Sequence, residues 1–230
     1  NKDNYKVPKA FNKWYFGSGS DLDLSYDIPD NIWNRIKLTG WNMLSNVPSH
    51  KNYIKVNENK PIDICAIFGT GGDEPTPAHG VTTHILYREH RENIIKVVDE
   101  LSKKYNVASS RQPFDQYMKT LYDSKICISP YGMGEIRQGD GESIQLGTII
   151  CKEDMSLFDF GSNVWIEDET YIPFDYDCSN LYEQLDNALK NYNPEIVNNM
   201  RRKYLEEYDY HKLCKRWYDI FRNIDGISDE

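Results

Sequence analysis

The sequence predicts an α/β protein with a doubly wound, mainly parallel sheet. From residue 61 onward, short apolar segments of strand length alternate with longer segments of helical period. The connections between them are polar and rich in glycine and proline, as loops are. A hydrophobic content of 39% and an aromatic content of 13% suit a packed core, and 230 residues suffice for one large domain or two small ones.

The elements follow one another in the order that a parallel sheet requires. Strands are predicted at 62–68, 106–109, 126–129, 148–151 and 164–166, and helices at 87–105, 114–122, 141–146 and 181–189. Strands that alternate with helices join in parallel, with the helices covering both faces of the sheet. A last helix is predicted to begin at Asn193 and Pro194, because asparagine is a good N-cap and proline a good first helical residue. Apolar residues at helical spacing from Val197 onward predict that this helix packs on the domain.

Three regions are predicted along the chain. Residues 1–58 are rich in Asn, Asp, Ser and aromatic residues without a sustained period, and we expect a small irregular N-terminal lobe. Residues 59–192 form the sheet domain, and residues 193–230 the C-terminal helix that packs back. Because the sequence does not begin with Met, we expect it to be part of a longer multidomain chain.

Charge and composition exclude several classes of protein. A net charge of −9 argues against non-specific binding of nucleic acid, which requires a basic face. No apolar run approaches the ~20 residues that span a bilayer. The five cysteines have no metal-ligand spacing. Cys65 and Cys127 lie in apolar segments, so we expect them to be core residues in a reducing compartment, the cytoplasm.

The segment from Ser124 to Lys152 is the strongest candidate for a functional site. Its loop carries four glycines with an arginine and a glutamate: Gly132, Gly134, Gly139, Gly141, Arg137 and Glu142. Glycine permits close approach of the backbone to a ligand, and a guanidinium can pair with two phosphate oxygens. We expect Glu142 to open the next helix, where the dipole favours a carboxylate that can accept bonds from a ribose diol. A nucleotide site at the end of a strand and a plain surface turn explain the loop equally well.

The order of residues in this segment resembles the donor-nucleotide half of GT-B glycosyltransferases, especially the exostosin-like and spore-protein-like group. The matching residues are Ser124, Lys125, Pro130, Gly132, Arg137, Glu142, Gly147 and Ile149–Ile150, and the resemblance covers about 62–189. It implies that Glu142 binds the ribose hydroxyls of a nucleotide-sugar and that Arg137 lies near the diphosphate. The six residues between Glu135 and Glu142 do not match the spacing of the two glutamates in many retaining members.

The resemblance implies an enzyme, a glycosyltransferase for a hexose or deoxyhexose. The donor would be a nucleoside diphosphate sugar, with a UDP-sugar favoured and UDP-rhamnose among the candidates, and the acceptor a glycan. Neither a metal nor another cofactor is required by this scheme. Residues 59–192 would be the Rossmann-like donor domain and residues 1–58 a reduced acceptor side. The composition would suit one module of a large-virus multidomain glycosyltransferase, working in the host cytoplasm.

A second polar loop follows the strand at 62–68 and faces the same crevice if the sheet is doubly wound. Arg88 and Arg91 lie three residues apart on the next helix, and we expect both to point toward the diphosphate. An inverting transfer needs a general base, and the nearest candidates are Asp73, Glu74 and His79. For each of these residues, a solvated surface role is the simpler account.

Other functions remain open on the sequence. The segment IFGTGGDE after a strand superficially resembles the first motif of S-adenosylmethionine-dependent methyltransferases, although no acidic residue ends the next strand. A non-catalytic glycan-binding module would account for the aromatic residues of 1–58. A metal site is not predicted, since the Asp21 and Asp23 pair follows no buried strand and reads as a solvated turn.

Overall fold

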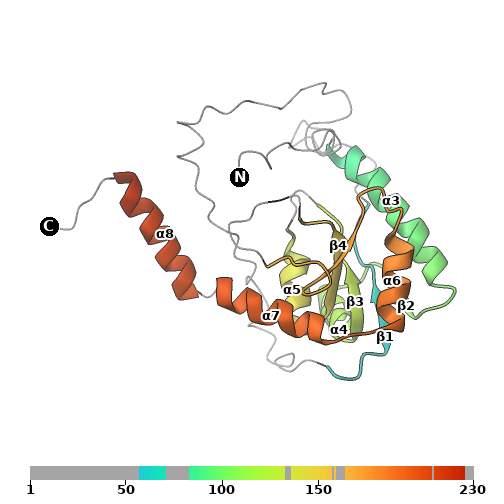
Figure 1. Ribbon diagram of the computed structural model, residues 1–230. Helices are drawn as coiled ribbons and strands as arrows, with labels where there is room; N and C mark the ends of the chain where they lie inside the picture. The colour runs from blue at the N-terminus through green and yellow to red at the C-terminus, as the bar shows by residue number, and fades with distance from the viewer. Residues whose placement is uncertain are drawn as a thin grey trace.

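The computed structural model describes residues 57–70, 83–132, 136–156, 158, 164–208 and 210–225. The predicted N-terminal lobe of residues 1–58 therefore lies almost entirely outside the described residues. The described part is built around one sheet with helices on both sides (Figure 1).

All five strands of the sheet are parallel, in the order β2-β1-β3-β4-β5. Their bounds are Ile62–Cys65 for β1, Val107–Ala108 for β2, Ser124–Ile128 for β3, Ile149–Glu153 for β4 and Ile172–Phe174 for β5. The chain runs from β1 outward to β2, then crosses back to β3 and continues in the other direction. This order confirms the predicted doubly wound sheet, and its direction changes between β1 and β3.

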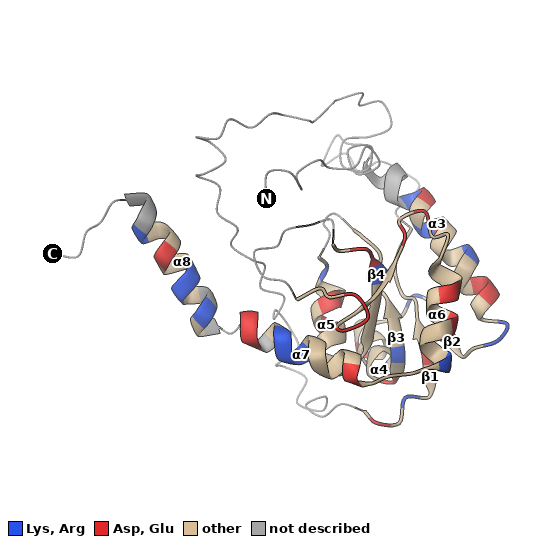
Figure 2. Cartoon of the chain, viewed as in Figure 1, with Lys and Arg blue, Asp and Glu red and all other residues tan. Residues whose placement is uncertain are grey.

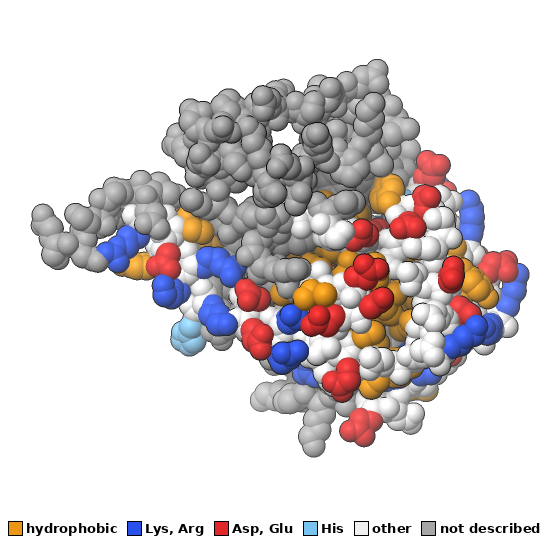
Figure 3. Space-filling model, viewed as in Figure 1, with side chains coloured by type: hydrophobic (Ala, Val, Ile, Leu, Met, Phe, Trp, Pro, Cys, Tyr) orange, Lys and Arg blue, Asp and Glu red, His pale blue; other side chains and the backbone are white. Residues whose placement is uncertain are grey.

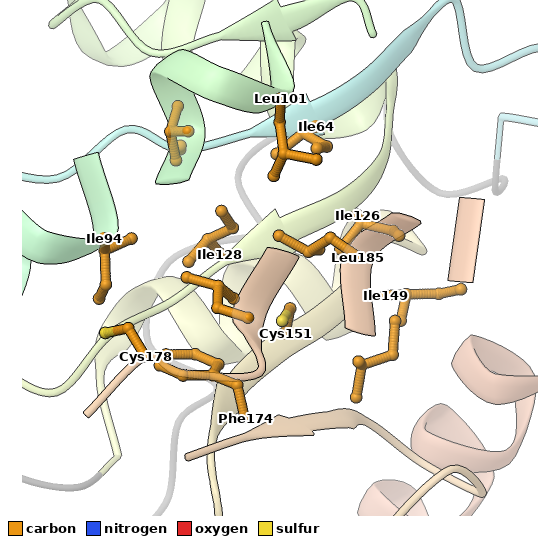
Figure 4. Close-up of a cluster of buried hydrophobic side chains, with 14 of the residues drawn as sticks. Ile64, Ile94, Leu101, Ile126, Ile128, Ile149, Cys151, Phe174, Cys178 and Leu185 are labelled. Atoms are coloured by element: carbon orange, nitrogen blue, oxygen red, sulfur yellow. The ribbon is translucent and has the colours of Figure 1, made fainter. Parts of the chain in front are cut away.

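Helices cover both faces of the sheet because successive strand residues point to opposite sides. On one face Ile64, Ile126 and Ile128 pack against α3 (Thr83–Leu101) and α6 (Leu181–Lys190), as Figure 4 shows. On the other face Cys65 and Cys127 pack against α4 (Phe114–Tyr122) and α5 (Gln138–Leu146). The two cysteines are buried, which confirms them as core residues.

The C-terminal region is made of two helices, α7 (Glu195–Tyr208) and α8 (Tyr210–Asp225). The predicted start is confirmed, because the Asn193 side chain accepts a hydrogen bond from the backbone N–H of Glu195 at 3.1 Å. Met200 and Tyr204 of α7 are buried against α5 and β4. Along α8, by contrast, Trp217, Tyr218 and Phe221 are exposed. Figure 2 shows that Lys and Arg are prominent on α8.

The expected strand at 164–166 is wrong. The Thr170 side chain forms hydrogen bonds with backbone groups that a strand would pair with its neighbour. Its Oγ1 donates to the carbonyl of Val164 at 2.7 Å and accepts from the N–H of Ile166 at 2.8 Å. Residues 164–166 thus lead into a tight turn, in which Asp168 has a positive φ of 55°, and they do not join the sheet. The fifth strand comes directly after it, as β5.

The helix α5 begins at Gln138, three residues before its predicted start, because a capping box forms at its N-terminus. The backbone N–H of Arg137 donates to the Asp140 carboxylate at 2.7 Å. Asp140 is therefore the acidic residue of the first turn, and Glu142 lies two residues further along the helix. The prediction that Glu142 opens the helix was wrong for this reason. The helix ends at Leu146 and is capped by Gly147, whose φ of 73° is left-handed and suits glycine.

Candidate nucleotide-binding site

The candidate site lies where the direction of the sheet changes, at the carboxyl ends of β1 and β3. These two strands are neighbours, with Cys65 paired to Cys127 in register. The loops that follow them must therefore start side by side, which is the place where open α/β sheets bind their ligands. The two loops that the sequence singled out thus leave the same edge of the sheet.

Three of the predicted site residues come together here. Arg91, on α3, and Arg137, at the start of α5, flank Gly132 in the loop after β3. A Cβ atom at Gly132 would lie 3.4 Å from Arg91 Nη2 and 3.5 Å from Arg137 Cδ. Both arginine side chains thus lie in van der Waals contact with the loop at Gly132.

The two arginines support the loop through its carbonyl groups. Arg91 is buried; its Nε and Nη2 donate to the Tyr131 carbonyl at 3.2 and 2.7 Å, and its Nη1 donates to the Gly69 carbonyl. Arg137 is partly exposed, and its Nη1 donates to the Pro130 carbonyl at 3.0 Å. Arg91 therefore ties the loop after β1 to the loop after β3, whereas Arg137 is the more accessible cation.

Arg88 has a different environment from Arg91. It lies on a more exposed part of α3, and its Nε pairs with Glu92 at 2.8 Å. Pairs of this kind at i and i+4 are common on solvated helix faces and contribute little stability. Among the described residues, Arg91 therefore bonds the loop carbonyls of Gly69 and Tyr131, and Arg88 pairs with Glu92.

Glu142 is buried between α4 and α5. Gln138 Nε2 donates to Glu142 Oε1 at 3.0 Å, and the Tyr117 hydroxyl is hydrogen-bonded to the same carboxylate. Burial, Cys127 and the Glu142 carboxylate all raise the pKa of Tyr117, so its hydroxyl stays protonated and acts as a donor. Gly139 permits the close approach of the Tyr117 hydroxyl to α5, because a Cβ at residue 139 would lie 3.2 Å from that hydroxyl.

Two buried pairs of polar side chains beside the loop, a Lys–Asp ion pair and a His–Glu hydrogen-bonded pair, were not predicted from the sequence. Lys152 Nζ lies 3.2 Å from Asp140 Oδ2, and His90 Nε2 lies 2.5 Å from Glu153 Oε1. All four side chains are nearly or fully inaccessible to solvent. The sequence does place Lys152 and Glu153 directly after an apolar strand segment. Because a buried charge without a partner is too costly, this position could have indicated that both residues have partners.

The Glu153 carboxylate predicts a dependence of stability on pH. Burial acts to raise its pKa, but the hydrogen bond from His90, the charge of Lys152 and the N–H of Tyr131 outweigh burial and hold the pKa below its ordinary value of 4.5. A lowered carboxyl pKa contributes stability above the ordinary value, which is lost as the pH falls through the lowered one. Urea unfolding should show Glu153→Gln clearly less stable than wild type at neutral pH, with the difference shrinking in acid. A difference that is constant with pH would contradict this assignment.

Several predicted residues lie outside the described part of the chain, namely Asp73, Glu74, His79 and Gly134. Among the described residues there is no group of three or more His, Cys, Asp or Glu side chains placed to hold a metal ion. None of the described helices is long and apolar enough to cross a membrane. On the face seen in Figure 3, acidic and basic side chains are interspersed.

Comparison with known proteins found similarity in structure and none in sequence. No protein-family model matches the chain, and no curated protein sequence matches it. Sucrose-phosphate synthase from Thermosynechococcus elongatus is similar in structure, with a TM-score of 0.45 and 16% sequence identity over 82% of this chain. The similarity spans 52% of that enzyme, so this chain corresponds to about half of its length. A similarity of this size supports no argument about function, and the fold is assigned from the order of the strands.

Proposed function

We propose that this chain binds the donor of a glycosyltransferase, a nucleoside diphosphate sugar, and transfers the sugar to a glycan acceptor. The observation that carries the proposal is the meeting of Arg91, Gly132 and Arg137 where the sheet changes direction. A UDP-sugar is the favoured donor and UDP-rhamnose one candidate. The acceptor side would come from residues 1–58 or from further parts of a longer, cytoplasmic protein.

The chemistry that the site would supply is stabilisation of the leaving nucleoside diphosphate. As the glycosidic bond to phosphate breaks, negative charge grows on the diphosphate oxygens. The partly exposed guanidinium of Arg137 and the N-terminus of α5 would offset this charge without a metal ion. Arg91 holds the loop after β3, which leads to Arg137 and the N-terminus of α5. We assign the general base that activates the acceptor hydroxyl to Asp73, Glu74 or His79, to be distinguished by substituting each in turn.

Glu142 would bind the ribose. One oxygen of its carboxylate accepts from Gln138, and Tyr117 also bonds the group. These donors fix the orientation of the carboxylate, which can accept further bonds from a ribose diol through its remaining lone pairs.

Calorimetry with UDP, GDP and a UDP-sugar tests the proposal. We expect UDP to bind, Arg137→Ala to weaken binding about 10- to 100-fold, as loss of a bond between charged groups does, and Glu142→Gln to weaken it less. Arg202→Ala is the matched control, because Arg202 is an exposed arginine of α7 paired with Asn199. If folded wild-type protein binds none of these nucleotides, the proposal fails.

Two other functions make different predictions. A methyltransferase would need an acidic residue after β2 for the adenosine ribose, but β2 ends at Ala108 and Ser109 follows. Stabilisation against heat by S-adenosylmethionine, and not by UDP, would favour this alternative. A glycan-binding module would bind oligosaccharide without nucleotide, and Arg137→Ala would leave that binding unchanged.

A further inference from the structure

The end of β4 carries two adjacent charged residues that are buried on opposite sides of the sheet. Lys152 points toward α5, where it meets Asp140, and Glu153 points toward α3, where it meets His90. Each buried charge is thus matched by a partner from the helix that covers its face. Such an arrangement is costly to build, since both members of each pair must lose their water.

Both residues also bind the backbone of the loop after β3. Lys152 Nζ donates to the Ser129 carbonyl at 2.9 Å. The Glu153 carboxylate accepts from the Tyr131 N–H, at 2.9 and 3.2 Å from its two oxygens. The three residues from Ser129 to Tyr131 are therefore held at both ends by one dipeptide.

The remaining polar groups of this turn are tied to the same network. The Tyr131 carbonyl accepts two bonds from Arg91, which follows His90 on α3. Asp140 accepts from the Ser129 hydroxyl and from the Arg137 N–H. The Tyr131 ring lies over Lys152 Nζ, with 5.2 Å from the nitrogen to the ring centroid. Both the N–H and the carbonyl of Tyr131 are thus bound to side chains.

We propose that Lys152 and Glu153 are positioning residues. They fix the conformation of the loop after β3, and with it the positions of Gly132 and Arg137, before any ligand binds. Buried charged groups, even when paired, contribute little net stability compared with apolar residues of the same size, so the use of Lys152 and Glu153 here points to control of geometry. A loop held in this way would not need to be ordered on binding, which lowers the cost of binding. That the bound ligand is a nucleoside diphosphate rests on the proposed function above.

The test measures the loop without ligand, by hydrogen exchange of the Tyr131 amide in the folded protein. We expect exchange to be slowest in wild type, intermediate in Glu153→Gln, which keeps one acceptor oxygen, and at least about tenfold faster than wild type in Glu153→Ala. The matched control is Lys125→Met combined with Asp63→Asn, which removes a partly buried ion pair at the other end of strands β1 and β3. Global stability is measured in parallel by urea unfolding.

The proposal is supported if the graded acceleration at Tyr131 exceeds the change in global stability and is absent from the control. It is overturned if exchange at Tyr131 follows global stability in every variant, or if Glu153→Gln and the control behave alike. Should Glu153→Ala not fold, the comparison of Glu153→Gln with the control decides. UDP affinity is measured last, with a loss of about tenfold expected in Glu153→Gln. If wild type binds no nucleotide, the proposed function fails while the result on the loop stands.

Discussion

Replacement of Lys152 by Met is expected to destabilise the protein by about 3–5 kcal/mol, the cost of breaking a buried ion pair by removing one partner. Lys152 and Asp140 are both fully buried, and their Nζ and Oδ2 atoms lie 3.2 Å apart. Without the ammonium group, the Asp140 carboxylate would keep two donors among the described residues, the Ser129 hydroxyl and the Arg137 N–H. Urea unfolding, followed by circular dichroism, measures the loss.

Two controls separate the loss of charge balance from the loss of packing. Addition of Asp140→Asn to Lys152→Met should recover a large part of the stability, because the uncompensated charge is removed while an acceptor for Ser129 remains. Lys125→Met breaks a more exposed pair with Asp63 and should cost no more than about 1 kcal/mol. Equal losses for Lys125→Met and Lys152→Met would show that the Lys152 pair has no special role.

Replacement of Arg91 by Ala is expected to cost about 2–4 kcal/mol, because it leaves partly or fully buried carbonyl groups without their donor. To the described residues, Arg91 donates two hydrogen bonds to Tyr131 and one to Gly69. The substitution should also weaken UDP binding, since the loops after β1 and β3 lose their common support. Thermal and urea unfolding give the stability, and calorimetry gives the affinity.

The variant Arg91→Lys should recover only part of this loss, since an ammonium group cannot reach both carbonyls with the planar geometry of a guanidinium. Arg88→Ala provides the comparison on the same helix. Because Arg88 is more exposed than Arg91 and pairs with Glu92 at the surface, its loss should cost less stability than the loss of Arg91. A larger effect for Arg88 than for Arg91 would mean that the assignment of the supporting arginine is reversed.

The elements themselves were largely predictable from residue patterns. The helix from Phe114 to Tyr122 has the predicted bounds, and β2 lies within the predicted 106–109. These elements depend on local spacing of apolar residues and on terminal residues such as Asn193, which act within a few positions. The start of α5 was missed because Arg137 and Asp140 form a capping box where the sequence showed only a glycine-rich loop.

The candidate site was predictable in its place but not in its contacts. The glycines and Arg137 after an apolar strand, and Arg91 after another, predicted two loops at one edge, and the pairing of β1 with β3 brings those loops together. The division between Arg91 and Arg88 depends on which side of α3 faces the loop carbonyls. The spacing of three residues between Arg88 and Arg91 does not show which of the two faces the loop carbonyls.

By itself, the sequence determined an alternating α/β order, a doubly wound sheet and a glycine-rich loop at the end of a buried strand. Only the tertiary structure decided that Lys152 and Glu153 are paired with Asp140 and His90, and that these pairs hold Ser129 and Tyr131. The physical reason is the range of the forces. Apolar periodicity and caps act between near neighbours in sequence, whereas a buried charge takes its partner from whatever helix covers its face of the sheet.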